Sequence, residues 1–331
     1  MNFFVAFGKG FVQMFRSIGM WLLFYALNFL LALFAIIPLD NLIASKLGRS
    51  LALGDLLEGY DYTTYSDFRN LPGVRDALPA ILNQSLLTLL LFFLLAIFLT
   101  GGILKVLRDH KERFRFQHFW TGCSTYFWRL FRLTLYFLLV HAMILSLAIG
   151  LFLFLTEGGN ILSLDSELEY LNALKIAGPA YLFLASIFFM IHDYAKVHMV
   201  HLDDNWMLRP FWQSFGIALS NFFRTYPLYL LNALVFVGLF SAYWYLQQYI
   251  QPSDARGVAL AFALGQGFIL ARIGSKIWNL ASITFMYQGI QQRRQRKKEI
   301  VQPNEPTDMS PLIISDVGSE ETAPFLKKEE E

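Results

Sequence analysis

The densest group of titratable side chains occupies a short stretch in the second half of the chain. It contains three histidines, three aspartates and one lysine: His192, Asp193, Lys196, His198, His201, Asp203 and Asp204. His198 and His201 are three residues apart, so on a helix they share a face, and a nearby carboxylate would complete a metal site. A polar helix end accounts for the same residues without a ligand, and we prefer that interpretation. We therefore expect no cofactor and no metal. If a metal does bind, His198 and His201 are its candidate ligands.

Arg272 is an isolated charge because it lies inside a long apolar run. A charge in apolar surroundings is costly and marks either a functional site or a structural ion pair. Asp193 is the only carboxylate expected at comparable depth, so we predict that Arg272 bonds Asp193, directly or through one water, with His192 nearby. Other polar residues in the apolar runs more often form hydrogen bonds between helices than bind a substrate. They are Asn28, Asn83, Gln84, His141, Asn232 and Gln266.

Composition and missing motifs exclude several classes of protein. Apolar residues make up 56% and charged residues 16% of the chain, which is typical of a protein embedded in lipid. A net charge of +2 supplies no concentrated basic face for nucleic acid. The single cysteine, Cys123, excludes an intramolecular disulfide and a cysteine-built zinc site. The sequence has no H-E-x-x-H, Walker or G-x-S-x-G motif, so we expect no enzymatic activity.

Six apolar runs are long enough to cross a bilayer as helices, which needs about 20 residues each. Pro79, Pro179 and Pro227 lie at or close to the starts of their runs, where the missing N–H costs nothing. The runs lie near residues 18–38, 79–103, 130–155, 178–199, 227–249 and 257–285. The sequence therefore predicts an all-α, polytopic membrane protein.

The connecting segments carry their basic residues unevenly. Lysines and arginines number 17 on the side of the termini and 6 on the other side. Because cytoplasmic loops are enriched in lysine and arginine, this bias places both termini in the cytoplasm.

Three stretches of fourteen residues align without gaps, and each leads into an outward span. They read FFVAFGKGFVQMFR from Phe3, FWTGCSTYFWRLFR from Phe119 and FWQSFGIALSNFFR from Phe211. The returning spans share a lysine at their inner ends, at Lys105, Lys196 and Lys276. We interpret this as three repeat units, about 1–115, 116–207 and 208–292, each with an amphipathic helix at the membrane interface followed by a helical hairpin.

The Phe-aromatic to Phe-Arg stretches, together with the segment from Gly101-Gly102 to Arg132, resemble uncharacterised six-helix bacterial inner-membrane families. These families are related in architecture to the membrane region fused to some glycerophosphodiester phosphodiesterases. The resemblance covers about residues 1–290 and implies the topology and a bacterial inner membrane. This chain has no hydrolase domain, so the resemblance carries over no catalytic residue.

The chain is expected to have two domains. Residues 1–292 form the transmembrane domain, and residues 293–331 form a basic juxtamembrane run and a disordered tail. Membrane lipids are expected partners. The external loop 40–77 and the tail 300–331 could each contact a protein partner.

Three functions remain open. A non-enzymatic scaffold or accessory subunit is favoured by repeats without a catalytic constellation. A transporter or channel for a small or lipidic solute is favoured by Arg272 and the polar residues in the spans. An intramembrane enzyme would need convergent catalytic groups that the sequence does not supply. A continuous polar cavity would favour transport, whereas a filled interior with paired polar residues would favour a scaffold.

The topology can be tested with reporter fusions. A reporter placed after Lys175 and one placed after Lys298 should report opposite sides of the membrane, because Lys175 lies in an external loop. Both reporters on one side would contradict the six-span arrangement.

Overall fold

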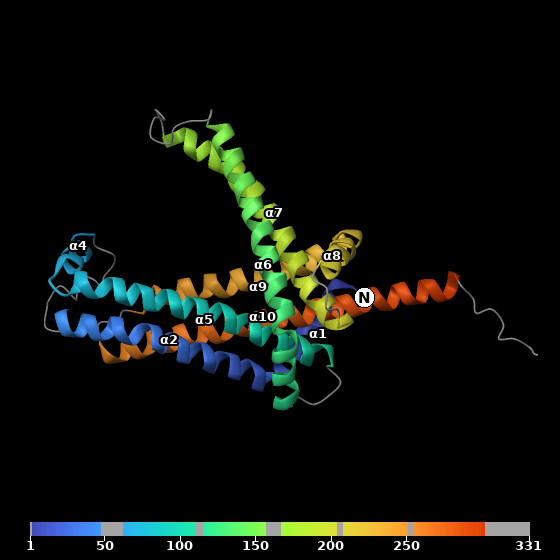
Figure 1. Cartoon of the computed structure of the whole chain (residues 1–331), viewed down its shortest axis with the longest axis horizontal. Helices are drawn as coiled ribbons and strands as arrows, with labels where there is room; N and C mark the ends of the chain where they lie inside the picture. Colours follow the sequence, from blue (N-terminus) through green and yellow to red (C-terminus); the bar gives the residue numbers. More distant parts are fainter. Residues whose placement is uncertain are drawn as a thin grey trace, which may run out of the picture. The chain divides into compact units, whose positions relative to one another are not determined.

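The computed structural model describes residues 2–47, 62–109, 115–156, 167–203, 208–250 and 254–301. All secondary structure in these ranges is helical (Figure 1). The chain divides into two units, residues 1–290 and 291–331, and the packed core lies in the first. The helices are α1 (Phe3–Arg16), α2 (Ile18–Leu47), α4 (Tyr62–Asn70), α5 (Val74–Arg108), α6 (Phe116–Leu155), α7 (Glu167–Leu202), α8 (Leu208–Ser220), α9 (Phe222–Gln247) and α10 (Ala255–Val301).

Six of these helices are long and apolar enough to cross a membrane, namely α2, α5, α6, α7, α9 and α10. The predicted all-α, polytopic membrane fold is therefore confirmed. The helices begin earlier than predicted, because Pro79, Pro179 and Pro227 lie inside helices and not at their first turns. Membrane helices tolerate an internal proline when neighbouring groups satisfy the freed carbonyl. The predicted partner segments are only partly described: the loop 40–77 lacks residues 48–61, and the tail lies outside the described residues from 302 onward.

The three aligned stretches, here called the leading segments (3–16, 119–132 and 211–224), differ in how they join their spans. The first is α1, which ends at Arg16 and is separated from α2 by Ser17, and the third is broken at Asn221 between α8 and α9. At the second break Asn221 and Thr225 side chains donate to carbonyls of α8 that have lost their helical partners. In the second unit the prediction of a separate helix is wrong, because α6 runs through residues 116–155 without interruption.

Burial follows the same pattern along the three leading segments. The fourth position is buried in all three segments (Ala6, Gly122 and Ser214), and so is the eighth position (Gly10, Tyr126 and Ala218). The residue that directly follows each segment is buried as well (Ser17, Leu133 and Thr225). The second aromatic and the final arginine are exposed each time, at Phe4, Trp120 and Trp212 and at Arg16, Arg132 and Arg224.

Each leading segment packs against the returning helix of the unit before it. The start of α6 packs on α5, where a Cβ atom at Gly102 would lie 2.5 Å from the Cys123 Sγ. α8 contacts α7 through Gln213 and His198. The first unit has no predecessor and packs instead on the last: the Trp278 Nε1 of α10 donates to the Phe7 carbonyl of α1 at 2.9 Å. The chain thus closes on itself.

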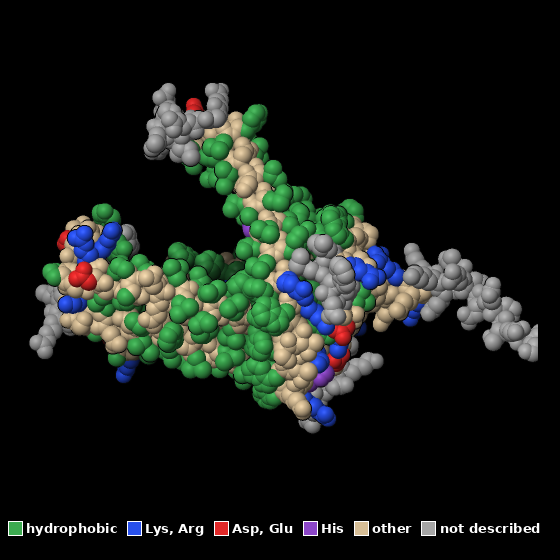
Figure 2. Space-filling view, viewed as in Figure 1, with side chains coloured by type: hydrophobic (Ala, Val, Ile, Leu, Met, Phe, Trp, Pro, Cys, Tyr) green, Lys and Arg blue, Asp and Glu red, His purple; other side chains and the backbone are tan. Residues whose placement is uncertain are grey.

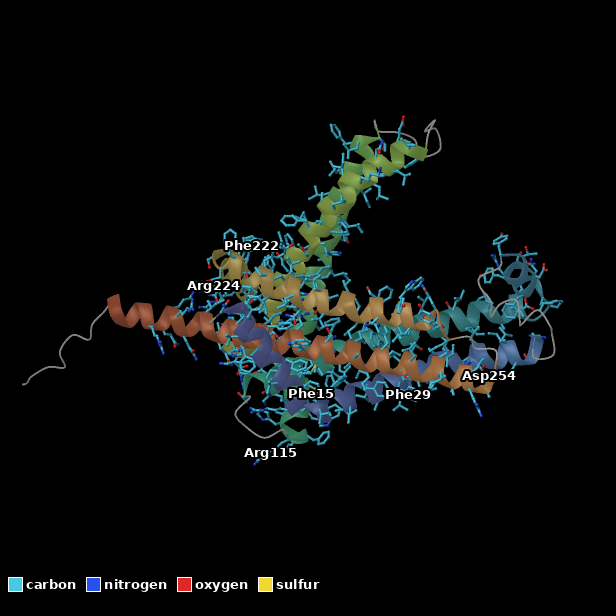
Figure 3. All side chains as sticks on the ribbon, turned by 180° about the vertical axis from the view of Figure 1, so that it is seen from behind. Phe15, Phe29, Arg115, Phe222, Arg224 and Asp254 are labelled. Carbon is cyan, nitrogen blue, oxygen red and sulfur yellow. The ribbon has the colours of Figure 1, made fainter. Side chains whose placement is uncertain are left out.

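The buried core lies at the ends of the helices that adjoin the leading segments. It includes residues 97–107 of α5, 190–200 of α7 and 273–290 of α10. The opposite halves expose large apolar side chains, as Leu139 and Phe154 of α6 do (67% and 80%), and apolar side chains cover much of the surface (Figure 2). Figure 3 labels Arg224, in the first turn of α9, and Asp254, directly before α10.

The α5–α6 crossing should be intolerant of any side chain at Gly102. A Gly102→Ala Cβ would meet the Phe119 ring at 2.7 Å and the Cys123 Sγ at 2.5 Å, so we expect destabilisation of about 1–3 kcal/mol from overpacking. Thermal unfolding in detergent measures it. Gly150→Ala is the matched control, because no atom lies within 4 Å of its Cβ and helix propensity favours alanine. Equal stability of the two variants would contradict the close crossing.

Candidate functional site

Asp193 ties α7 to α10. Its Oδ1 accepts from the Lys196 Nζ at 2.9 Å, and its Oδ2 accepts from the Asn279 Nδ2 at 3.0 Å. Arg272 makes no salt bridge within the described ranges, so the direct form of the predicted bond to Asp193 is absent there. A bond through one water stays a prediction. Lys196 is one turn from Asp193 on the same helix, so its ammonium group reaches the Asp193 carboxylate without any other helix.

The two histidines proposed as metal ligands are already hydrogen-bonded. The buried His198 lies with its Nε2 2.8 Å from Gln213 Oε1 and its Nδ1 2.7 Å from Tyr287 Oη. Because a glutamine oxygen only accepts, Nε2 carries the proton and Nδ1 accepts from the tyrosine. Gln288 donates to the His201 Nε2 at 3.1 Å. His198 therefore joins α7 to both α8 and α10, and His201 joins α7 to α10. A metal would have to displace these bonds.

His192 is placed apart from these bonds. Its ring stacks on Phe137 of α6, with centroids 4.2 Å apart. Its Nε2 has no hydrogen-bond partner among the described residues. His192 therefore packs α7 against α6 and does not join the Asp193 contacts.

A second set of polar contacts, which the sequence does not predict, joins the ends of α5, α6 and α7. Arg108 donates to the Tyr126 Oη and the Val200 carbonyl, both at 3.0 Å. Burial raises the pKa of the adjacent Asp109, but hydrogen bonds from Arg108 and His118 outweigh it and hold this pKa below its ordinary value.

Asp203, just after α7, adopts a left-handed φ of 51°, which aspartate tolerates better than most residues. A hydrogen bond from Arg129 lowers the pKa of Asp203. Contacts of this kind depend on loop geometry, and spacing within the sequence does not reveal them.

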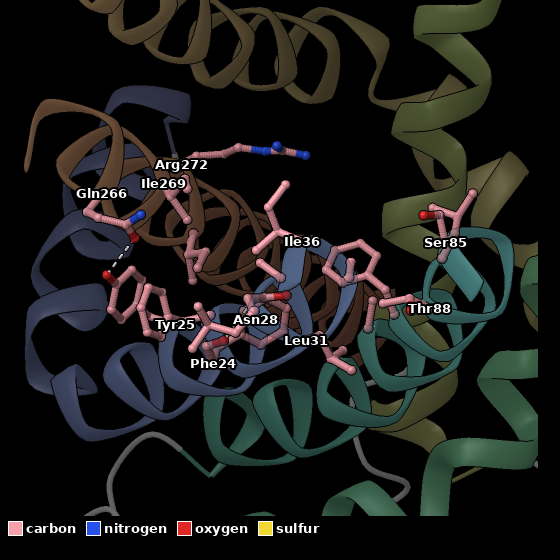
Figure 4. A pocket seen from close by; sticks show the side chains of 18 of the residues that line it. Phe24, Tyr25, Asn28, Leu31, Ile36, Ser85, Thr88, Gln266, Ile269 and Arg272 are labelled. Atoms are coloured by element: carbon pink, nitrogen blue, oxygen red, sulfur yellow. Dashed lines mark hydrogen bonds between the residues drawn. The ribbon is translucent and has the colours of Figure 1, made fainter. Parts of the chain in front are cut away.

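A pocket of about 850 Å³ lies between α2, α5 and α10 (Figure 4). Its 21 lining residues include Phe24, Phe29 and Ile36 of α2, Leu89 and Phe92 of α5, and Phe262 and Ile269 of α10. Its uncharged polar residues are largely bonded within the protein. Asn28, Ser85 and Thr88 donate to carbonyls of their own helices, and Gln266 accepts from the Tyr25 Oη at 2.8 Å.

Two cations line this pocket, Arg272 and Lys276 of α10. The Lys276 Nζ lies 5.4 Å from the centre of the Phe24 ring. Figure 4 shows the Arg272 side chain extending away from α10. Both side chains are exposed to the pocket side of α10. The sequence singled out both residues, but it did not place them in one pocket with α2 and α5.

Among the described residues no group of three or more His, Cys, Asp or Glu is arranged to hold a metal ion. Comparisons of the chain with protein-family models, with curated proteins and with solved structures found no match. The chemistry of the site therefore has to be argued from its own residues.

Neutral variants should separate the roles of Asp193 and Arg272. Asp193→Asn removes the negative charge beside Lys196 and one of the two acceptor oxygens, so Lys196 or Asn279 loses its acceptor, and we expect destabilisation of about 1–3 kcal/mol. Arg272→Gln removes no salt bridge within the described ranges and should leave the unfolding temperature unchanged in detergent that has stripped bound lipid. If both variants lowered the unfolding temperature equally, the result would support an interaction between Arg272 and Asp193.

Proposed function

We propose that this chain is a non-enzymatic membrane scaffold or accessory subunit, made of three repeated hairpins with both termini in the cytoplasm of a bacterial cell. The shared burial pattern of the leading segments supports true repetition, because composition alone would not reproduce which positions are buried. The excess of lysine and arginine beside the termini supports the orientation.

The observation that carries the scaffold proposal is the internal pairing of polar groups within the spans. Gln266 is bonded to Tyr25, His141 lies 3.0 Å from Tyr181, and Gln84 donates to the Phe34 carbonyl. A transport path or a catalytic site needs polar groups that are free to meet a solute. Here they join one helix to another, and His198 and Asp193 do the same near the inner ends.

A second candidate is a transporter for a lipidic solute. The pocket between α2, α5 and α10 favours it, because this pocket is apolar and carries two cations. The scaffold is preferred because one such pocket does not make a path across the membrane.

The scaffold proposal can be tested by purification in mild detergent with protein identification. The full chain should retain a partner at near-stoichiometric yield, and a chain ending at residue 301 should lose it while keeping the same helical content. The Gly150→Ala full chain serves as a control that should retain the partner. Recovery without a partner, together with movement of a lipid probe across vesicles containing only this protein, would favour the transporter instead.

A further inference from the structure

The pocket between α2, α5 and α10 is long enough for a lipid chain. Its lining on α10 runs from Phe262 to Lys276. At 1.5 Å per residue this is about 21 Å, more than half of the roughly 30 Å hydrocarbon thickness. A groove of this length in a membrane-embedded surface opens onto acyl chains and not onto water, so the bilayer itself supplies the molecules that enter it.

The middle of the pocket offers an occupant almost no hydrogen-bond donors. The hydroxyls of Ser85 and Thr88 and the amide of Asn28 donate to their own helices. The remaining lining there is aliphatic and aromatic, with Phe29, Phe92 and others contributed by facing helices. This lining suits a hydrocarbon chain.

The charged end of the pocket is electropositive. Lys276 has three charged groups in electrostatic range: Arg272, Lys196 and Asp193. Counting Lys276 itself, three of these four groups are cationic and one is anionic. Asp193 already binds Lys196 and Asn279, so it is committed elsewhere. Arg272 and Lys276 therefore present two charges to an anionic group, and arginine suits phosphate because its guanidinium can donate two parallel hydrogen bonds.

The repeat shows that this arrangement is special to the third unit. Lys105, at the position of Lys276, is packed into the α5–α6 crossing, where its Cβ would lie 2.7 Å from a Cβ at Gly122. Lys196 at the same position binds Asp193. Position 272 corresponds to Gly101 and His192, which pack inside the protein. Of these three pairs of positions, only the third carries a cation at both, and both of its cations line the pocket between α2, α5 and α10.

We propose that this pocket binds an anionic phospholipid from the surrounding bilayer. Its acyl chain lies between α2, α5 and α10, and its phosphate contacts Arg272 and Lys276. Lys276 marks the headgroup level, and Arg272, about 6 Å deeper along the helix, reaches the same phosphate with its long side chain. The inference does not depend on the scaffold role, since either a scaffold or a transporter can hold such a lipid.

Native mass spectrometry tests the site directly. The full chain is reconstituted with equal amounts of phosphatidylglycerol and phosphatidylcholine, extracted in mild detergent, and its retained lipids are counted. We expect phosphatidylglycerol to be retained in preference. The double variant Arg272→Gln/Lys276→Gln should lose about tenfold or more of that preference. The control Lys9→Gln/Arg224→Gln removes two exposed cations that do not line the pocket and should behave as wild type.

A pocket-filling variant provides an independent test. Ala32→Phe, in the lining of the pocket, should reduce retention of phosphatidylglycerol, whereas Ala142→Phe on the exposed face of α6 should not. The proposal is overturned by equal retention of both lipids in the wild type, which requires no variant to fold. Displacement of the lipid by millimolar inorganic phosphate, or unchanged retention in the double variant, would also overturn it.

Discussion

The rest of the structure depends on the close crossing of helices near the ends that adjoin the leading segments. In lipid there is no hydrophobic force between helices, so association rests on packing and hydrogen bonds, and small residues allow the closest approach. Gly101, Gly102 and Gly122 bring α5 and α6 together, and Gly10 brings α1 against Ser282 of α10. Because each leading segment sits on the preceding unit, these crossings convert three hairpins into one closed core, and the apolar halves beyond it face lipid.

The closure of the first unit on the last also creates the pocket. Gly274 allows α10 to meet Trp21 of α2, whose Nε1 donates to the Leu270 carbonyl at 2.8 Å. This contact fixes α2 beside α10, and α5 completes the third wall. The pocket's two cations therefore owe their position to α10 and their apolar surroundings to the first unit. A scaffold that holds a lipid in this way would couple its own packing to the membrane around it.

The sequence predicted the parts of the fold that depend on length and hydropathy, and it failed where contacts decide. All six spans were found, because apolar runs of this length have few alternatives. The end of α1 at Arg16 was predicted correctly. The continuity of α6 was not predicted, because its leading segment resembles the other two in sequence although it is not followed by a break. Arg272 was rightly singled out, yet its expected partner Asp193 binds Lys196 and Asn279, and such competition is visible only in three dimensions.

Closure of the chain through α1 and α10 is the central claim, and cysteine crosslinking tests it most directly. In a Cys123→Ala background, Phe7→Cys/Trp278→Cys should crosslink with a short bifunctional thiol reagent, because the side chains at these two positions are in contact, with ring centroids 4.4 Å apart. Phe4→Cys/Trp278→Cys should not, since Phe4 is 61% exposed. Crosslinking of the second pair with the same yield, or none for the first, would contradict the closed arrangement.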